Sequence, residues 1–169
     1  VMASLLRAMI TNCGMTVASG ERASLTVLAE RGHPHSSAGP TSGEHRGPHL
    51  PVRAYASVGE CGPLVVPGLT PCLRCHDLHR RDSDPAWPLL GVQWAQCADR
   101  HTPIDSLLAH QLAVTTVALI RRWIDAPELV EDWSCMAYRL ELPVGVVETQ
   151  PRPAHPLCGC QWDALARSS

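Results

Sequence analysis

Two closely spaced cysteine pairs constrain this chain more than any other feature of its sequence. Cys72 and Cys75 are separated by Leu-Arg, and Cys158 and Cys160 are separated by one glycine. Such spacers place two thiolates about 3.5–4 Å apart, as a tetrahedral zinc site requires, and leave backbone amides free to donate to sulfur. If the pairs meet in space, they join the middle of the chain to a distant segment in a closed four-sulfur structural zinc site.

The first pair also fits a different pattern, because Cys72-Leu-Arg-Cys75-His76 matches the attachment motif of a c-type haem. Haem attachment implies export, and residues 1–10 show no basic start followed by an apolar run and a cleavage site. A haem would also leave the second cysteine pair without a role. A third interpretation is that these thiols are ordinary buried or exposed cysteines. We favour zinc over both alternatives.

Composition favours a single globular domain in the cytoplasm. The chain has 169 residues, of which 45% are hydrophobic, so it can form one real core. Its eight cysteines are unevenly spaced and no signal peptide precedes them, which favours a reducing compartment with a metal over a disulfide scaffold. The formal net charge of −2 predicts neither nucleic-acid nor membrane-surface binding, and the apolar stretch over residues 112–120 is too short to span a membrane.

The sequence argues against nucleotide chemistry on this chain alone. All 14 basic side chains other than histidine are arginine, so no lysine can contact a phosphate or form a Schiff base. The glycines form neither G-x-G-x-x-G nor the P-loop spacing, which removes the usual backbone cradle for phosphates. We therefore do not expect ATP to bind this chain by itself.

Hydrophobic periodicity predicts both helices and strands. We expect helices over residues 3–11 and 104–125, a helix that begins at Asp84-Pro85, and strands over residues 24–29, 52–58, 62–66, 135–142 and 144–148. The strands over 52–58 and 62–66 are expected to meet around Gly59-Glu60, and a Pro67-Gly68 turn then leads to the first cysteine pair. An extended segment over residues 151–156 leads to the second pair.

The same periodicity assigns side chains to the core. The helix over 104–125 is expected to be central, with a buried face formed by Ile104, Leu107, Leu108, Leu112, Thr115, Leu119, Ile120 and Trp123. The helix after Asp84 is expected to bury Trp87, Leu90, Trp94 and Cys97. The strand over 135–142 is expected to bury Met136, Tyr138, Leu140 and Leu142. Residues 31–49 are rich in Gly, Pro and Ser and predict a solvated loop whose histidines do not bind metal: His33, His35, His45 and His49.

Several segments resemble a known family. They are Gly62-Pro-Leu-Val-Val-Pro-Gly68, the run from Cys72 to Pro88 with its D-x-H-R and D-P-A-W-P motifs, and His155-Pro-Leu-Cys158-Gly-Cys160. In this order they resemble the C-terminal part of ThiF-type, ubiquitin-activating-enzyme-like proteins. The most similar branch comprises the cyclodehydratase or leader-peptide-binding proteins of thiazole/oxazole-modified microcin biosynthesis. The similarity covers roughly residues 46–162.

The resemblance implies an α/β fold: a partial ThiF-like, Rossmann-related sheet, mostly parallel, with helices and a structural zinc on the same four cysteines. Compared with that family, the nucleotide-binding N-terminal half and the leader-binding module are expected to be missing. Residues 1–45 are then expected to form a remnant α/β unit with a flexible loop. Residues 46–162 are expected to form the zinc-containing region, and residues 163–169 a tail.

Three functional hypotheses follow from the resemblance and the residues. The first is a non-catalytic partner that binds a precursor peptide and presents it to a YcaO-type enzyme, which uses ATP to cyclise Cys, Ser or Thr. The second is a truncated ThiF-type adenylyltransferase that needs another chain for ATP. The third is a small zinc-containing interaction module that contacts an acidic partner through Arg80-Arg81 and Arg121-Arg122. An open flank of the sheet would also favour pairing with a second copy of the chain.

Outside the two pairs, the sequence offers few reactive groups. Cys61, in an expected turn, is the one candidate for a reactive thiol, whereas Cys97 and Cys135 are expected to be packing residues. The acidic side chains near the first pair are expected to serve as a solvated turn and a helix cap and not to bind magnesium: Asp77, Asp82 and Asp84.

Overall fold

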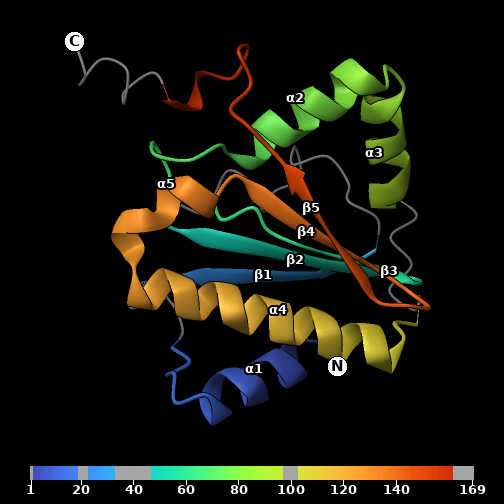
Figure 1. Cartoon of the computed structure of the whole chain (residues 1–169). Coiled ribbons are helices and arrows are strands. Elements are labelled where there is room, and N and C mark those ends of the chain that lie inside the picture. The colour runs from blue at the N-terminus through green and yellow to red at the C-terminus, as the bar shows by residue number, and fades with distance from the viewer. Residues whose placement is uncertain (1, 19–22, 33–46, 97–102, 162–169) are drawn as a thin grey trace.

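The structure is a computed structural model that describes residues 2–18, 23–32, 47–96 and 103–161. A five-stranded sheet lies in the middle, with α1 and α4 on one face and α2 and α3 on the other (Figure 1). This arrangement confirms the predicted α/β class. The elements are α1 (Met2–Asn12), β1 (Thr26–Arg31), β2 (His49–Tyr55), β3 (Val58–Cys61), α2 (Leu73–Ser83), α3 (Trp87–Gln96), α4 (Ser106–Asp125), α5 (Val130–Trp133), β4 (Met136–Glu141) and β5 (Val146–Pro151).

The sheet has the strand order β1-β2-β3-β4-β5. Strands β1 and β2 are parallel, and the pairings β2–β3, β3–β4 and β4–β5 are antiparallel. The mostly parallel sheet that the resemblance implied is therefore not found in the described part of the chain. The short connections from β2 to β3 and from β4 to β5 explain this difference, because tight hairpins can join only antiparallel strands.

The first hairpin turns earlier than we expected. Its turn lies at Ala56 and Ser57, where Ala56 has a φ of 47°, and not at Gly59-Glu60. Gly59 lies inside β3, and it is a glycine because α4 packs directly against it. A Cβ there would come within 3.2 Å of side-chain carbons of Leu108 and Leu112. The strand expected over 62–66 is also wrong, since Val65 forms only an isolated bridge with His49.

The central helix is confirmed, and α4 supplies much of the core. Asp105 caps it by accepting a hydrogen bond of 2.7 Å from the Leu107 amide, and Pro127 follows its end. Its buried side chains are Leu108, Ala109, Leu112, Ala113, Thr116, Val117, Leu119 and Ile120. Leu107 was wrongly assigned to this face: it is 56% exposed, because the buried stripe runs through 108, 112, 116 and 119.

The two faces of the sheet differ in chemistry. The face toward α4 is apolar and carries Leu50, Val52, Ala54 and Leu140 in the core. The opposite face carries a row of alternating charges that lie directly opposite one another across every strand: Glu30, Arg53, Glu60, Arg139 and Glu148. We call this set the charged row. Opposite charges at facing positions stabilise a sheet, so the row helps to fix the strand register.

The predicted alternation of β4 is largely confirmed. Tyr138, Leu140 and Leu142 pack against the apolar core, as expected. Ala137 is also buried, but it faces the other side of the sheet, so both faces of this strand are covered. The next strand begins at Val146 and not at Val144, because residues 142–145 form a turn in which Gly145 has a φ of 70°.

The helices near the first cysteine pair were predicted less well. Helix α2 was missed, because its sequence contains few apolar residues and buries only Leu73, Cys75 and His76. Asp84 follows α2, and its carboxylate accepts a hydrogen bond of 2.9 Å from the Ala86 amide, so the expected cap holds although α3 begins at Trp87.

The expected core face of α3 is only partly confirmed. Trp87 and Leu90 are half-buried, while the side chain of Trp94 and residue Cys97 lie outside what the structure describes. Leu89 and Val92 on the same helix are exposed. This helix therefore lies on the surface of the α2 layer.

The loop over 31–49 can be assessed only at its ends. His33, His35 and His45 lie outside the described residues, and His49 is buried at the start of β2, contrary to the expected solvated position. Strand β1 lies in the same sheet as β2 to β5, and Met2 and Leu6 of α1 lie in the same core as α4. The division of the chain at residue 45 stays a prediction. Among the described helices, none has the length and apolar character needed to cross a membrane.

We predict that Leu112→Ala destabilises the protein by about 2–5 kcal/mol, because it removes a fully buried side chain and leaves a cavity against Gly59. The matched control is Val114→Ala on the same helix, where the side chain is 57% exposed and the expected change is within about 0.5 kcal/mol. Urea unfolding of both variants measures the difference. Equal destabilisation by the two substitutions would contradict the assigned face of α4.

Candidate metal centre

The two cysteine pairs meet in space. Cys72 is the residue before α2 and Cys75 lies in its first turn, while Cys158 and Cys160 lie in the turns that follow β5. The sulfur atoms of Cys72 and Cys158 are 3.5 Å apart, those of Cys75 and Cys160 are 3.4 Å apart, and those of Cys72 and Cys75 are 3.9 Å apart. We call these residues the cysteine cluster. All four sulfurs lie within 4.8 Å of one another, so the cluster could hold a metal ion.

The sulfurs are too far apart for disulfide bonds, and each cysteine of the cluster is a free thiol. A hydrogen bond from the Cys75 thiol lowers the pKa of Cys72 to about 5, and the same bond raises the pKa of Cys75. Burial raises the pKa of Cys160. Among these three cysteines, Cys72 forms a thiolate most readily, and a cation that binds there must displace the protons of Cys75 and Cys160.

Contacts outside the sulfurs also hold the two pairs together. The backbone amide of Cys158 donates to the carbonyl oxygen of His155 at 2.9 Å. The His155 Nδ1 accepts from the Leu157 amide at 3.0 Å, so its Nε2 carries the proton and donates to the Asp82 carboxylate at 2.8 Å. His155 is buried, whereas Asp82 is exposed on α2. The hydrogen bond from His155 lowers the pKa of Asp82.

A second histidine, His79 of α2, contacts the segment that contains His155. The ring of His79 meets the ring of His155 edge to face at 4.7 Å, and its Nε2 lies 3.1 Å from the carbonyl oxygen of Pro153. Sequence reasoning missed both histidines as supports for the cluster. The only sequence signal was their presence in the segments that also contain the cysteine pairs, at His79 and His155.

The structure does not support Cys61 as the candidate for a reactive thiol. Cys61 ends β3 and faces α4, where it is fully buried and its sulfur lies 3.4 Å from the Thr116 hydroxyl. Burial raises the pKa of Cys61 to about 12, so the thiolate is scarce. That candidate followed from the misplaced hairpin turn. Cys135 is half-buried just before β4, and Cys13 is exposed after α1.

The arginine pairs that were candidates for contacts with an acidic partner already have partners within the chain. Arg80 bonds to Glu60 at 3.2 Å and lies 4.8 Å above the ring of Trp87. The other three interactions are those of Arg81 with Asp82 at 2.8 Å, of Arg121 with Asp125 at 2.8 Å, and of Arg122 with the Trp133 ring at 4.9 Å. These contacts weaken the hypothesis of an interaction module that depends on the two pairs.

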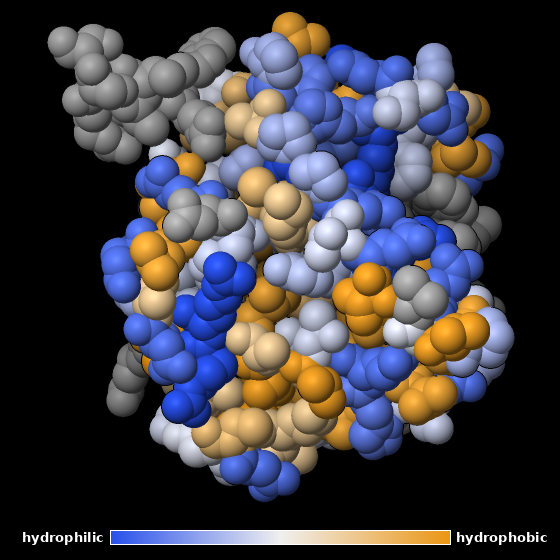
Figure 2. Space-filling view, viewed as in Figure 1, coloured by the Kyte–Doolittle hydropathy of each residue, from blue (hydrophilic) through white to orange (hydrophobic). Residues whose placement is uncertain are grey.

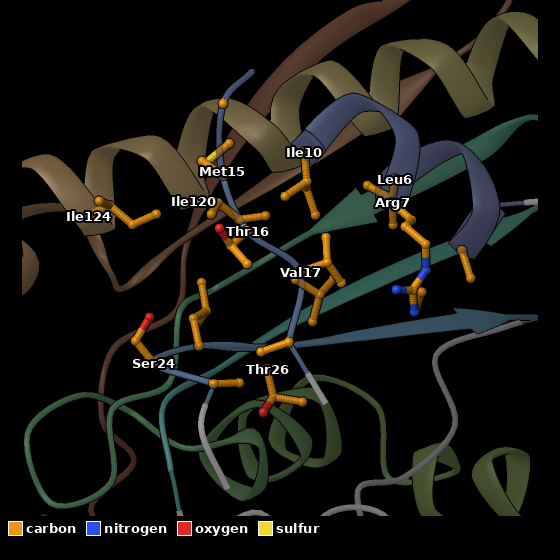
Figure 3. A pocket seen from close by; sticks show the side chains of 17 residues that line it. Leu6, Arg7, Ile10, Met15, Thr16, Val17, Ser24, Thr26, Ile120 and Ile124 are labelled. Atoms are coloured by element: carbon orange, nitrogen blue, oxygen red, sulfur yellow. The ribbon is translucent and has the colours of Figure 1, made fainter. Parts of the chain in front are cut away.

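The structure also contains an apolar cavity of about 660 Å³ on the face of the sheet away from the cysteine cluster. Figure 3 shows side chains from α1, from α4 and from the segment before β1 around this cavity, among them Leu6, Ile10, Val17 and Ile120. The described lining contains no histidine, cysteine or carboxylate. The cavity can therefore bury apolar groups, but it offers no metal ligand or acid–base group.

Polar side chains gather on the other side of the molecule. Figure 2 shows hydrophilic residues concentrated over the α2 region, while hydrophobic residues are more frequent over the half that contains α4 and α1. The exposed apolar side chains of α4 include Leu107, Val114 and Ile124. The cysteine cluster thus lies in the polar half, beside α2.

The fold with its α-β-α layers and sheet is shared with solved heterocyclase and microcin synthetase structures. A heterocyclase in complex with substrate and cofactor gives a TM-score of 0.66 at 19% identity, over 99% of this chain and 24% of that chain. The heterocyclase TruD gives a TM-score of 0.57 at 20% identity, and the match covers 99% of this chain and 26% of TruD. A chain of the E. coli microcin synthetase McbBCD complex gives a TM-score of 0.58 at 17% identity, and the match covers 94% of this chain and 64% of that chain.

These matches confirm, for the fold, the resemblance that the sequence motifs predicted. This chain spans about a quarter of the length of the first two structures. No protein-family model matches the sequence, and no curated protein matches it. The chain therefore has the fold of one part of a larger heterocyclase.

We predict that Cys61 resists alkylation by iodoacetamide between neutral and mildly alkaline pH, because its pKa of about 12 keeps the thiol protonated throughout that range. The exposed Cys13 serves as the internal control and is expected to react at least about tenfold faster. Mass spectrometry of labelled peptides measures both rates, and in denaturant the two should converge. Equal labelling of both cysteines in the folded protein would contradict the buried position of Cys61.

Proposed function

We propose that this chain is a non-catalytic, zinc-containing partner in the biosynthesis of azoline-modified ribosomal peptides, as a ThiF-like component of a cyclodehydratase. The observation that carries this proposal is the match of 99% of the chain to part of a heterocyclase. The family motifs around the cysteine pairs support it independently. In this role the chain acts in the cytoplasm, where thiols stay reduced.

The proposed metal is zinc, held by Cys72, Cys75, Cys158 and Cys160. Zinc–sulfur bonds of about 2.3 Å in a tetrahedron require sulfurs about 3.8 Å apart. The separations of 3.4, 3.5 and 3.9 Å between the measured pairs fit this requirement. Four thiolates would fill every position of a tetrahedral ion, so the zinc would be structural and would offer no site for substrate.

The zinc would fix α2 to the segment that follows β5. Without it, the links between them are the hydrogen bond from His155 to the exposed carboxylate of Asp82 and the contacts of His79 with Pro153 and His155, and single exposed polar contacts contribute only about 0–1 kcal/mol. Structural zinc contributes on the order of 10 kcal/mol in small zinc modules. In our proposal the metal therefore determines whether the polar half of the molecule keeps its shape.

The proposed partners are a YcaO-type enzyme and a precursor peptide. One similar structure is a complex named McbBCD, and another is a heterocyclase with substrate and cofactor. In this scheme the YcaO-type enzyme binds ATP, and this chain helps to present the peptide. A chain without lysine and without a glycine-rich phosphate loop suits that division of labour. A homo-oligomer is compatible with the same role.

The function can be tested by reconstitution. We expect a precursor peptide gene and a YcaO-type gene beside the gene for this chain. With those purified components and ATP, omission of this chain should lower ring formation at least about tenfold, because correct positioning of a substrate contributes strongly to rate. Mass spectrometry detects each ring as the loss of one water. Undiminished ring formation without this chain would refute the proposed role.

A second experiment, a titration, distinguishes this proposal from a truncated adenylyltransferase. Isothermal titration of the zinc-loaded chain alone with MgATP should show no binding, because the sequence offers neither a phosphate-binding lysine nor a glycine-rich loop. Titration of the YcaO-type enzyme provides the positive control. Measurable binding of MgATP by this chain would support the adenylyltransferase instead.

The metal site makes a separate prediction. Cys75→Ala should reduce zinc content and lower the thermal stability of the protein, because three thiolates leave the tetrahedral site incomplete. Cys135→Ala, at a half-buried cysteine outside the cluster, should keep the zinc content of the parent protein. Elemental analysis and thermal unfolding measure the two properties. Equal zinc content in both variants would reject the ligand assignment.

A further inference from the structure

A polar cleft of about 410 Å³ lies between the α2–α3 pair and the charged row of the sheet. Three arginines line it: Arg80 of α2, Arg139 of β4 and Arg152, which directly follows β5. We call it the arginine cleft. Its walls also include the carboxylate of Glu60 and the ring of Trp87. None of these side chains belongs to the cysteine cluster.

The arginines of this region differ in how their charge is balanced. Arg53 bonds to Glu30 at 3.0 Å, and Arg80 bonds to both oxygens of Glu60 at 3.2 and 3.3 Å. Arg139 bonds to Glu141 at 3.0 Å. Each of these guanidinium groups therefore has a carboxylate within the chain.

Arg152 is different. Its Nη2 donates to the neutral amide oxygen of Gln150 at 2.6 Å. Its Nε is fully buried and has no hydrogen-bond partner among the described residues. A buried donor without a partner costs free energy, and Arg152 forms no ion pair with a carboxylate among the described residues. The cleft therefore contains one cation whose hydrogen-bonding capacity is incomplete.

The neighbouring arginines add to the positive charge of the arginine cleft. Burial lowers the pKa of Arg80, and the nearby positive charges of Arg152 and Arg53 lower it further against the opposing effect of Glu60. The guanidinium groups thus repel one another across a partly buried space. A bound anion would reduce this repulsion and would supply the acceptor that Arg152 lacks.

We propose that the arginine cleft binds a carboxylate of an acidic peptide segment, with Arg152 and Arg139 as its hydrogen-bond donors. A planar guanidinium matches a carboxylate through two parallel hydrogen bonds. The side chain of Arg139 is 31% exposed, so a ligand can reach this end of the cleft. The indole of Trp87 provides an apolar wall for the carbon chain of an acidic residue.

The position of the cleft favours a peptide. Two of its lining residues, Gln150 and Arg152, belong to β5 or directly follow it, and β5 is the last strand of the sheet. Edge strands can receive an extended segment through backbone hydrogen bonds while side-chain pockets supply specificity. A nucleic-acid backbone fits less well than a single carboxylate, because it would add several negative charges beside Glu60 and Asp84 in the walls. This site does not depend on the proposed function.

The test uses the zinc-loaded chain and a short peptide of glutamates with both ends capped. Isothermal titration should detect binding of this peptide, and a glutamine peptide of the same length should bind at least about tenfold more weakly. Arg152→Gln should weaken binding of the glutamate peptide by at least about tenfold. The matched control is Arg121→Gln, at an exposed arginine of α4 outside the cleft, which should leave the affinity unchanged.

Several results would overturn the proposal. Equal affinity of the parent protein and Arg152→Gln, or equal binding of the glutamine peptide, would do so. Displacement of the peptide by inorganic phosphate at comparable concentration would assign the cleft to phosphate, and tighter binding of a single-stranded oligonucleotide would assign it to nucleic acid. If circular dichroism shows that Arg152→Gln is unfolded, Arg139→Gln decides: it should weaken binding about fivefold, and an unchanged affinity would refute the site.

Discussion

The position of α2 depends on a contact between segments that are far apart in the sequence. Cys72 and Cys158 are separated by 86 residues, yet their sulfurs lie 3.5 Å apart. Helix α2 buries only Leu73, Cys75 and His76, so apolar burial contributes little to holding it in place. The cysteine cluster, the contacts of His155 and the ion pair of Arg80 with Glu60 therefore determine where this helix lies over the sheet. The arginine cleft in turn exists only because α2 and α3 cover the charged row.

The two halves of the molecule are stabilised by different interactions. On one face of the sheet, α4 packs so closely that Gly59 cannot carry a side chain without a shift of Leu108 or Leu112. Around Gly59 this half has the close packing of a usual protein interior. On the other face, ion pairs such as Arg53–Glu30 and Arg80–Glu60 lie beneath the α2 layer. Partly buried ion pairs require good geometry and complete hydrogen bonding, which makes this half more sensitive to the loss of one partner.

Sequence periodicity predicted the elements that follow a simple pattern. The central helix, the strand that contains Tyr138 and Leu140, and the meeting of the cysteine pairs were all visible in spacing or alternation. The hairpin was misplaced because Gly59 looked like a turn residue, whereas its small size serves the contact with α4. That contact joins residues about 50 positions apart, and local sequence contains no record of it. Helix α2 was missed for a related reason, since its position follows from sulfur and ion-pair contacts and not from an apolar stripe.

The spacing of the cysteine cluster has a consequence for the order of events during synthesis. The ribosome makes Cys72 and Cys75 long before Cys158 and Cys160, so the first pair exists for some time without its partners in the cysteine cluster. During that interval the apolar core around α4 can already form, because the residues of α4 all precede the second pair. The cysteine cluster can be complete only after the second pair has emerged. In the proposed zinc-bound form, coordination by all four sulfurs is therefore a late step in synthesis.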